Sequence, residues 1–242
     1  MEVIKSCKEN KKILCVGDVH GCLQTLQALI AKAGPVDQII SVGDLIDRGP
    51  DSLGVVKYCI DTNIQVCLGN HEFMALEAIS KYLGPDYPYK RMDLLDSDWF
   101  ANGGSGVFDS CSKEDLQFML DYFKSLPIYI KTDYTHNDLP VVVSHTCLNN
   151  YTYDILNATQ DDLRTHAESF VWSRTQAVSV ANFFNIYGHT PTDYLYIKGA
   201  VPRISPTGIN LDTGCVYQNN IDRGKLTAVL LPSMQIIQQD RL

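Results

Sequence analysis

The chain has 242 residues, of which 45% are hydrophobic and 20% are charged, a composition typical of one globular domain with a large core. Its formal net charge of −8, with basic residues dispersed along the chain, argues against a nucleic-acid substrate bound through its backbone. The sequence has neither a long apolar run that predicts a transmembrane helix nor the apolar segment of a signal peptide, so we expect a cytoplasmic protein without a membrane partner.

The first third of the chain alternates short apolar runs with helical patterns. Strands are predicted at residues 13–16, 39–42 and 64–68, and helices at 23–33, 52–60 and 72–82. Residues 84–90, rich in Pro and Tyr, interrupt this pattern, and residues 93–124 are mainly helical. We expect a single domain over residues 1–242, with a variable helical cap at about residues 83–126.

Strands dominate the chain after Pro127. They are predicted at residues 128–131, 141–144, 185–187, 194–197, 209–211 and 226–231. Alternating strands and helices followed by a run of strands predict an α/β fold of two packed mixed β-sheets, a β-sandwich flanked by helices.

Four motifs rich in possible metal ligands each follow an apolar stretch. They are Gly17-Asp18-Val19-His20-Gly21, Gly43-Asp44-Leu45-Ile46-Asp47-Arg48-Gly49, Gly69-Asn70-His71-Glu72 and Gly188-His189-Thr190-Pro191. Asp18, Asp44 and Asn70 follow one another at equal intervals of about 26 residues, roughly a strand plus its returning helix. Because open α/β sheets bind ligands at the carboxyl ends of their strands, we expect these side chains and His20 to converge.

Carboxylate, imidazole and amide donors together suit Mn, Fe or Zn. A hydrolytic site with two metal ions needs a carboxylate that bridges them, and Asp44, in the middle motif, is the best candidate. A single Gly-Asp or Gly-Asn pair is ordinary turn chemistry. Three such pairs in register, each after an apolar run, favour the metal site.

The ordered motifs resemble those of the phosphoprotein phosphatase branch of the calcineurin-like metallophosphoesterases, and are most similar to the bacterial and bacteriophage lambda-type serine/threonine protein phosphatases. The resemblance spans about residues 13–231 and implies the calcineurin-like metallophosphoesterase fold and two divalent metal ions, with Mn²⁺ expected and Fe or Zn as alternatives. It further implies two ligand sets that share one residue: Asp18, His20 and Asp44 for one ion, and Asp44, Asn70, His145 and His189 for the other.

His145 follows the predicted strand at residues 141–144, but Thr146 stands where the family usually has a small residue. His136 is the competing ligand, although its polar surroundings predict a solvated turn. His166 lies in a polar helical segment and is expected on the surface. We therefore assign the ligand position to His145.

His71 directly follows Asn70, and an imidazole paired with a carboxylate suits general acid catalysis near neutral pH. The resemblance implies this role for His71 with Asp47 as its partner; the alternative is that His71 only caps the following helix. Arg48 and Arg174 are the candidate phosphate-binding residues, because a guanidinium can donate two parallel hydrogen bonds to phosphate. For Arg174, which resembles the Trp-x-Arg element of the lambda-type branch, the alternative is a surface side chain packed on a ring.

The eight cysteines form no Cys-x-x-Cys pair, and those in apolar runs are typical of buried thiols, so disulfides are not expected. Cys215 follows Leu211-Asp212-Thr213-Gly214, a run that predicts a strand leading into a turn. Because no adjacent base is visible in the sequence, a nucleophilic role for Cys215 is disfavoured.

The predicted function is a metal-dependent phosphomonoesterase that hydrolyses phosphoserine and phosphothreonine by direct attack of a metal-bridging water or hydroxide, with a phosphoprotein or small phosphoester as substrate. The alternative is a symmetrical dinucleoside tetraphosphatase (diadenosine tetraphosphate hydrolase), whose family has a run similar to residues 48–53; the presence of Asp47 favours the protein phosphatase. A non-catalytic phosphopeptide-binding module is less consistent with the complete set of ligands and acid. Residues 217–224 and 82–89 are expected to shape substrate choice, since loops carry specificity.

Overall fold

The computed structural model describes residues 11–84, 97–149, 155–217 and 223–242. Ten strands in these parts form two five-stranded sheets. The first sheet has the order β10 (Gln235–Asp240), β9 (Lys225–Leu231), β1 (Ile13–Val16), β2 (Gln38–Ser41), β3 (Gln65–Val66). The second has the order β4 (Tyr129–His136), β5 (Leu139–Ser144), β6 (Phe184–Tyr187), β8 (Gly208–Asn210), β7 (Arg203–Ser205).

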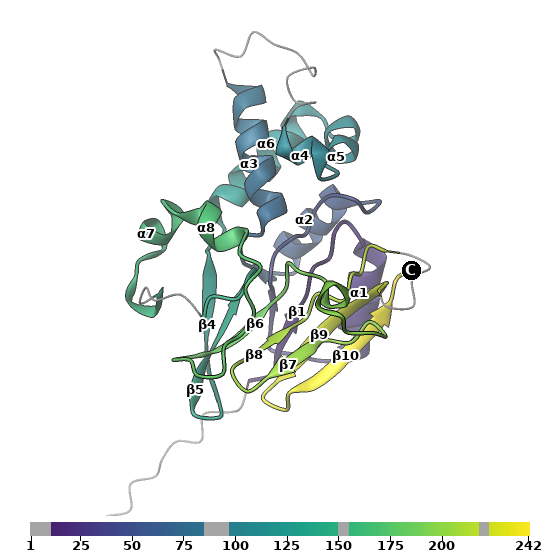
Figure 1. The fold of residues 1–242 in the computed structure, drawn as a ribbon. Helices are drawn as coiled ribbons and strands as arrows, with labels where there is room; N and C mark the ends of the chain where they lie inside the picture. Colours follow the sequence, from purple (N-terminus) through teal and green to yellow (C-terminus); the bar gives the residue numbers. More distant parts are fainter. Residues whose placement is uncertain (1–10, 85–96, 150–154, 218–222) are drawn as a thin grey trace, which may run out of the picture.

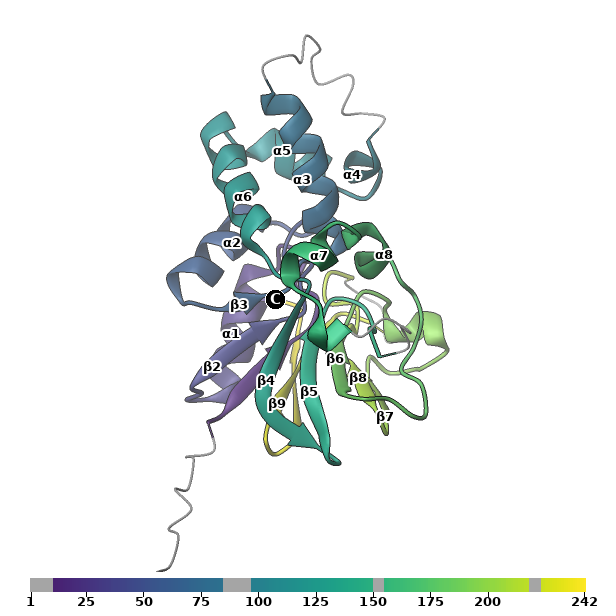
Figure 2. The ribbon, with the colours of Figure 1, turned by 90° about the vertical axis from the view of Figure 1, so that its left-hand side faces the viewer.

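Helices cover the outer face of the first sheet and one end of both sheets. The α-helices are α1 (Leu23–Ala33), α2 (Ser52–Asp61), α3 (Asn70–Leu83), α4 (Asp98–Ala101), α5 (Ser105–Ser110), α6 (Lys113–Ser125), α7 (Gln160–Arg164) and α8 (Ala167–Val171). Two 3₁₀ turns, η2 (Ile155–Asn157) and η3 (Thr192–Leu195), lie in the second half. Figures 1 and 2 show α3 to α6 gathered above one end of the sheets, while α1 packs along β9 and β10. No helix within the described ranges combines the length and apolar character that crossing a membrane requires.

The core has two layers because side chains alternate across each strand. On β1, Ile13 and Cys15 point into the layer between the two sheets, together with Val141, Val143 and other residues of the second sheet. The neighbouring β1 residues, 14 and 16, face the helices instead. Burial on both faces explains why β1 is a continuous apolar run with no polar residue.

Parallel pairing brings the motif loops to one end of the molecule. β1, β2 and β3 run parallel to one another, and so do β5, β6 and β8. The loops after β1, β2 and β3 are therefore neighbours, and they approach closely: a methyl group on Gly43 would lie 2.7 Å from the carbonyl oxygen of Cys67. This close approach at the ends of the strands is what positions the candidate site.

The predicted fold class of two packed mixed sheets with flanking helices is confirmed. The predicted strand at 194–197 is wrong, because that segment starts within η3 and passes through a left-handed residue, Tyr196, with φ 61°. The predicted turn around His136 is also wrong, since β4 continues to that residue and the turn falls at the next two residues. β7 and β10 were not predicted: β7 is short and β10 is a polar, partly exposed edge strand, so neither has an apolar run. Residues 85–96, which include most of the Pro- and Tyr-rich interruption, lie outside the described residues.

Replacing Gly43 by alanine should destabilise the protein by about 2–5 kcal/mol, because φ is +107° and the new methyl group would crowd the Cys67 oxygen and the Gly69 nitrogen. Urea unfolding followed by circular dichroism measures the change. Gly106→Ala in α5 is the matched control, since its methyl group would meet nothing within 4 Å. The control should change stability by less than about 1 kcal/mol; equal midpoints for the two variants would contradict the packing argument.

Candidate metal and catalytic site

The candidate site is built from backbone in an uncommon conformation. Five predicted site residues have positive φ: His20 (47°), Asp44 (50°), Asp47 (73°), Arg48 (65°) and His189 (71°). Residues other than glycine persist there only when the surroundings hold them, and such positions cluster at functional sites. The positive φ values therefore indicate that these loops belong to a functional site.

Hydrogen bonds between loops hold this backbone in place. The backbone N–H groups of Val19 and His20 both donate to the carbonyl oxygen of Asp44, at 3.1 and 2.9 Å, and the Gly21 N–H donates to the Leu45 oxygen at 2.7 Å. The first and second motifs are thus joined along their backbones. These bonds fix how the two loops lie relative to each other.

One cluster of ligand atoms lies around one carboxylate oxygen of Asp44. His20 Nε2 is 3.7 Å and His71 Nε2 is 3.9 Å from Asp44 Oδ2. The other ring nitrogen of His20 lies 2.9 Å from the Ile46 carbonyl oxygen, which fixes the ring so that Nε2 faces the cluster. These three residues, all buried, form a group that could hold a metal ion. Because His71 belongs to this group, the geometry allows it to be either a metal ligand or a general acid.

A second cluster lies around the other carboxylate oxygen of Asp44. His145 Nε2 is 3.4 Å from Asp44 Oδ1, 2.9 Å from Asn70 Oδ1 and 3.1 Å from His189 Nδ1. His189 Nδ1 is also 2.9 Å from Asn70 Oδ1. Buried oxygen and nitrogen lone pairs crowded this closely suit a cation of the Mn, Fe or Zn type. Asp44 thus offers one oxygen to each cluster, the geometry that a bridging carboxylate needs.

The environment of His20, His145 and His189 favours the neutral imidazole, the form that binds metals. Burial lowers the pKa of His20 and of His189 to about 3, with neighbouring imidazoles adding to the effect, and burial also lowers the pKa of His145. Asp18, the remaining predicted ligand, is buried and accepts a hydrogen bond from the His189 N–H at 3.0 Å. Burial and the carboxylates of Asp212 and Asp44 raise the Asp18 pKa well above its ordinary value, an unfavourable concentration of negative charge that a cation would relieve.

His71 and Asp47 form a close buried pair. His71 Nδ1 lies 2.6 Å from Asp47 Oδ2, and both side chains are almost fully excluded from solvent. Burial alone would lower the pKa of His71, but the carboxylates of Asp44 and Asp47 outweigh it and raise the pKa above its ordinary value. The Nε2 atom of this imidazole faces Asp44, so a proton carried there would point into the site.

The two predicted phosphate-binding arginines are both exposed. Arg48 Nη1 lies 3.1 Å from His20 Nε2, which places the guanidinium at the first cluster. Arg174 is near the second cluster: burial is the main cause of the low pKa of His189, and the positive charge of Arg174 adds to it. Arg48 and Arg174 are therefore exposed cationic residues in the neighbourhood of the clusters.

Glu72 and Asp212 are buried in the site without having been predicted as site residues. The Glu72 carboxylate accepts hydrogen bonds from the N–H groups of Asp44 (2.9 Å), Leu45 (2.7 Å) and Gly69 (3.1 Å). Burial raises the pKa of Asp212 to about 7. Glu72 could have been identified from the sequence, because it is the acidic residue that ends the third motif. Nothing in the sequence around Asp212 distinguishes that residue from a turn residue.

The competing residues lie elsewhere. The ring of His136 packs on Phe184 with 4.5 Å between centroids, and His166 is exposed at the start of α8. A hydrogen bond with Cys22, and then burial, raise the pKa of Cys215 well above its usual value, which argues against a thiolate nucleophile. The described cysteines are all free thiols.

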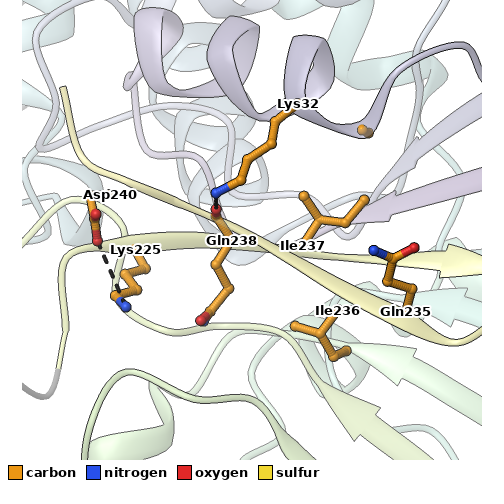
Figure 3. Close-up of a pocket in the computed structure, with 8 residues that line it drawn as sticks. Lys32, Lys225, Gln235, Ile236, Ile237, Gln238 and Asp240 are labelled. Atoms are coloured by element: carbon orange, nitrogen blue, oxygen red, sulfur yellow. Dashed lines mark hydrogen bonds and ion pairs between the residues drawn. The ribbon is translucent and has the colours of Figure 1, made fainter.

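A hollow of about 630 Å³ between α1 and β10 contains none of the predicted site residues (Figure 3). Its two lysines are already engaged. Lys32 donates to the carbonyl oxygen of Gln238 at 2.6 Å, and Lys225 pairs with Asp240 at 3.8 Å. This hollow is therefore separate from the candidate site.

Several known proteins are similar to this chain. Serine/threonine-protein phosphatase 2 of Escherichia coli (strain K12) is 34% identical over 56% of this chain and 58% of its own length. The protein of the same name from Salmonella typhimurium is 29% identical over 93% of this chain and 100% of its own length. The asymmetrical bis(5'-nucleosyl)-tetraphosphatase PrpE of Oceanobacillus iheyensis is 24% identical over 93% of this chain and 91% of its own length.

The fold is also similar to solved structures. A protein serine/threonine phosphatase from Saccharomyces cerevisiae, 15% identical, matches 98% of this chain and 82% of that chain with a TM-score of 0.58. A family model described as calcineurin-like phosphoesterase matches residues 11–214, a range that includes the four motifs and His145. The chain therefore belongs to the calcineurin-like phosphoesterase family.

Proposed function

We propose that this phosphoesterase is a metal-dependent phosphomonoesterase that acts on phosphoserine and phosphothreonine. The observation that carries the proposal is the position of Asp44, which offers one carboxylate oxygen to each of two buried ligand clusters and lies beside the His71–Asp47 pair. Two cation sites and an acid next to them are the groups that hydrolysis of a phosphate ester requires.

In the proposal, Asp18, His20 and Asp44 hold one divalent cation, and Asp44, Asn70, His145 and His189 hold the other. Burial of all these oxygen and nitrogen donors supports the set, and the shared Asp44 belongs to both groups of side chains that could hold a metal ion. When bound, the two ions would polarise the phosphoryl group and acidify the attacking water. Mn²⁺ as the native metal and a cytoplasmic location belong to the same proposal.

The remaining steps belong to side chains of the protein. His71 carries a proton on Nε2 and gives it to the oxygen of the leaving serine or threonine, while Asp47 stabilises the imidazolium through Nδ1. Arg48 and Arg174, exposed in the neighbourhood of the clusters, orient the phosphate. Protonation of the leaving oxygen is needed most when that oxygen is a strongly basic alkoxide, as in serine and threonine.

Hydrolysis of dinucleoside tetraphosphates is the second candidate function. It is supported by the similarity to PrpE, which is named an asymmetrical tetraphosphatase, and, for the symmetrical enzyme predicted from the sequence, by the run at residues 48–53. The contact between Asp47 and His71 favours the protein phosphatase, because it provides the acid that a poor leaving group requires.

Hydrolysis of phosphoserine and phosphothreonine peptides beside diadenosine tetraphosphate, on one Mn²⁺-loaded preparation, tests this choice. We expect kcat/KM to favour the peptides by about tenfold or more, a difference of about 1.4 kcal/mol in transition-state stabilisation. A preference for the dinucleotide would keep the metal chemistry and replace the substrate class. The segment 217–224, proposed to influence this preference, includes residues 218–222 outside the described residues.

Asp44→Asn should weaken both cation sites, by about tenfold or more in affinity, because the substitution removes the negative charge shared by the two clusters. Mn²⁺ titration followed by metal analysis of the dialysed protein measures the two sites. Glu77→Gln, an exposed substitution on α3, is the control with the same change of charge. Loss at one site alone would show that Asp44 is not the bridge.

His71→Asn should lower kcat by about 10²- to 10⁴-fold on phenyl phosphate, which has a poor leaving group, and much less on 2,4-dinitrophenyl phosphate, because a good leaving group needs little protonation. Metal content should remain that of the unmodified protein. If the substitution instead released metal, His71 would be a ligand, as its place in the first cluster also allows.

A further inference from the structure

The helices α4 to α6 form a helical segment above one end of the sheets (Figure 1), and Trp99, in α4, extends from this segment into the candidate site. Its side chain is 1% exposed, and its indole Nε1–H donates to both carboxylate oxygens of Asp47, at 3.0 Å to Oδ1 and 3.1 Å to Oδ2. α4 lies beside α3 at the end of the sheets (Figure 1). A residue 52 positions away in the chain thus contacts the partner of His71.

The contact completes the surroundings of Asp47. Its Oδ2 atom also lies 2.6 Å from His71 Nδ1, and its backbone N–H donates to Ser52 Oγ at 2.9 Å. Burial raises the pKa of Asp47, while the hydrogen bonds from His71 and Trp99 act in the opposite direction. An indole N–H can only donate, so it favours the ionised carboxylate, which can only accept.

Two glycines shape the chain around this contact. A methyl group on Gly104 would overlap the indole ring of Trp99, so the absence of a side chain there makes room for the ring. Gly103, with φ +109°, lies against Arg48: a methyl group on it would be 3.1 Å from Arg48 Cγ. The turn after α4 is therefore fitted both to the indole and to the loop that carries Asp47.

We propose that Trp99 is a positioning residue, which holds the Asp47 carboxylate against His71 and so makes the helical segment part of the proton-donating machinery. The inference rests on the proposed function, because it requires His71 to be the general acid. The alternative is that Trp99 only fills the core of the helical segment, where its ring packs on Phe100 with 5.8 Å between centroids.

Trp99→Phe separates these roles, because phenylalanine keeps an aromatic ring and loses the N–H donor. We expect kcat on phenyl phosphate to fall about 10- to 100-fold, the range for loss of a hydrogen bond to a charged group. On 2,4-dinitrophenyl phosphate the fall should be small, and KM and bound Mn²⁺ should not change. Phe100→Leu is the matched control: it disturbs the same packing, keeps the N–H donor, and should leave the ratio of the two substrates unchanged.

A double-mutant cycle tests the route through Asp47. In an Asp47→Asn background, Trp99→Phe should cost little further rate on phenyl phosphate, because the carboxylate that the indole positions is already gone. If Trp99→Phe does not fold, Gly104→Ala, which keeps the indole and displaces it, should reproduce the dependence on leaving group. Thermal melts identify a variant that has lost its fold.

Equal losses on both substrates, or fully additive losses with Asp47→Asn, would overturn the inference and leave Trp99 a packing residue. Failure of the proposed function looks different. If His71→Asn itself shows no dependence on leaving group, the acid assignment fails, and the role of Trp99 fails with it. If His71→Asn and Asp47→Asn show the dependence and Trp99→Phe does not, only the inference about Trp99 is wrong.

Discussion

The carboxylate of Glu72 is the constraint on which the candidate site depends. It accepts hydrogen bonds from backbone N–H groups of two loops, one at Asp44 and Leu45 and one at Gly69, and it is completely buried. These bonds hold Asp44 at a positive φ, and that conformation lets its two oxygens face different clusters. Because Glu72 lies in the first turn of α3, the same helix start that presents Asn70 and His71 also fixes the loop opposite them. The hydrogen bonds of Glu72 thus help to fix the positions of the candidate ligands.

The sequence could predict which loops meet, because their motifs recur at equal intervals after apolar runs and parallel strands end at a common edge. The chemical roles of Asp18, His71 and the other site residues stay predictions. The contact of Trp99 with Asp47 could not be predicted, since no local pattern relates residues so far apart in the chain. The same limit applies to β10, whose polar residues suit an edge strand and form no apolar run. Sequence patterns report local burial, whereas these contacts depend on how helices dock on the ends of the sheets.

The helical segment and the sheets each carry residues of the candidate site. The loops after the strands carry most of the candidate ligand atoms, and α3 carries Asn70 and His71 in its first turn. α4 contributes Trp99, which contacts Asp47. Asp47 is therefore held both by α3, through His71, and by α4, through Trp99. Arg48 is likewise shared, since it approaches His20 on one side and Gly103 on the other.

The residues of the second cluster come from loops of both β-sheets. Asn70 follows the last strand of the first sheet, whereas His145 and His189 follow β5 and β6 of the second. A cation held by all three would add a link between two sheets that, in the described residues, pack mainly through apolar side chains. Its binding energy would then belong partly to the fold, because a ligand that binds only the native state opposes unfolding. Metal affinity and resistance to heat would then be linked, and the candidate site would also stabilise the packing of the two sheets.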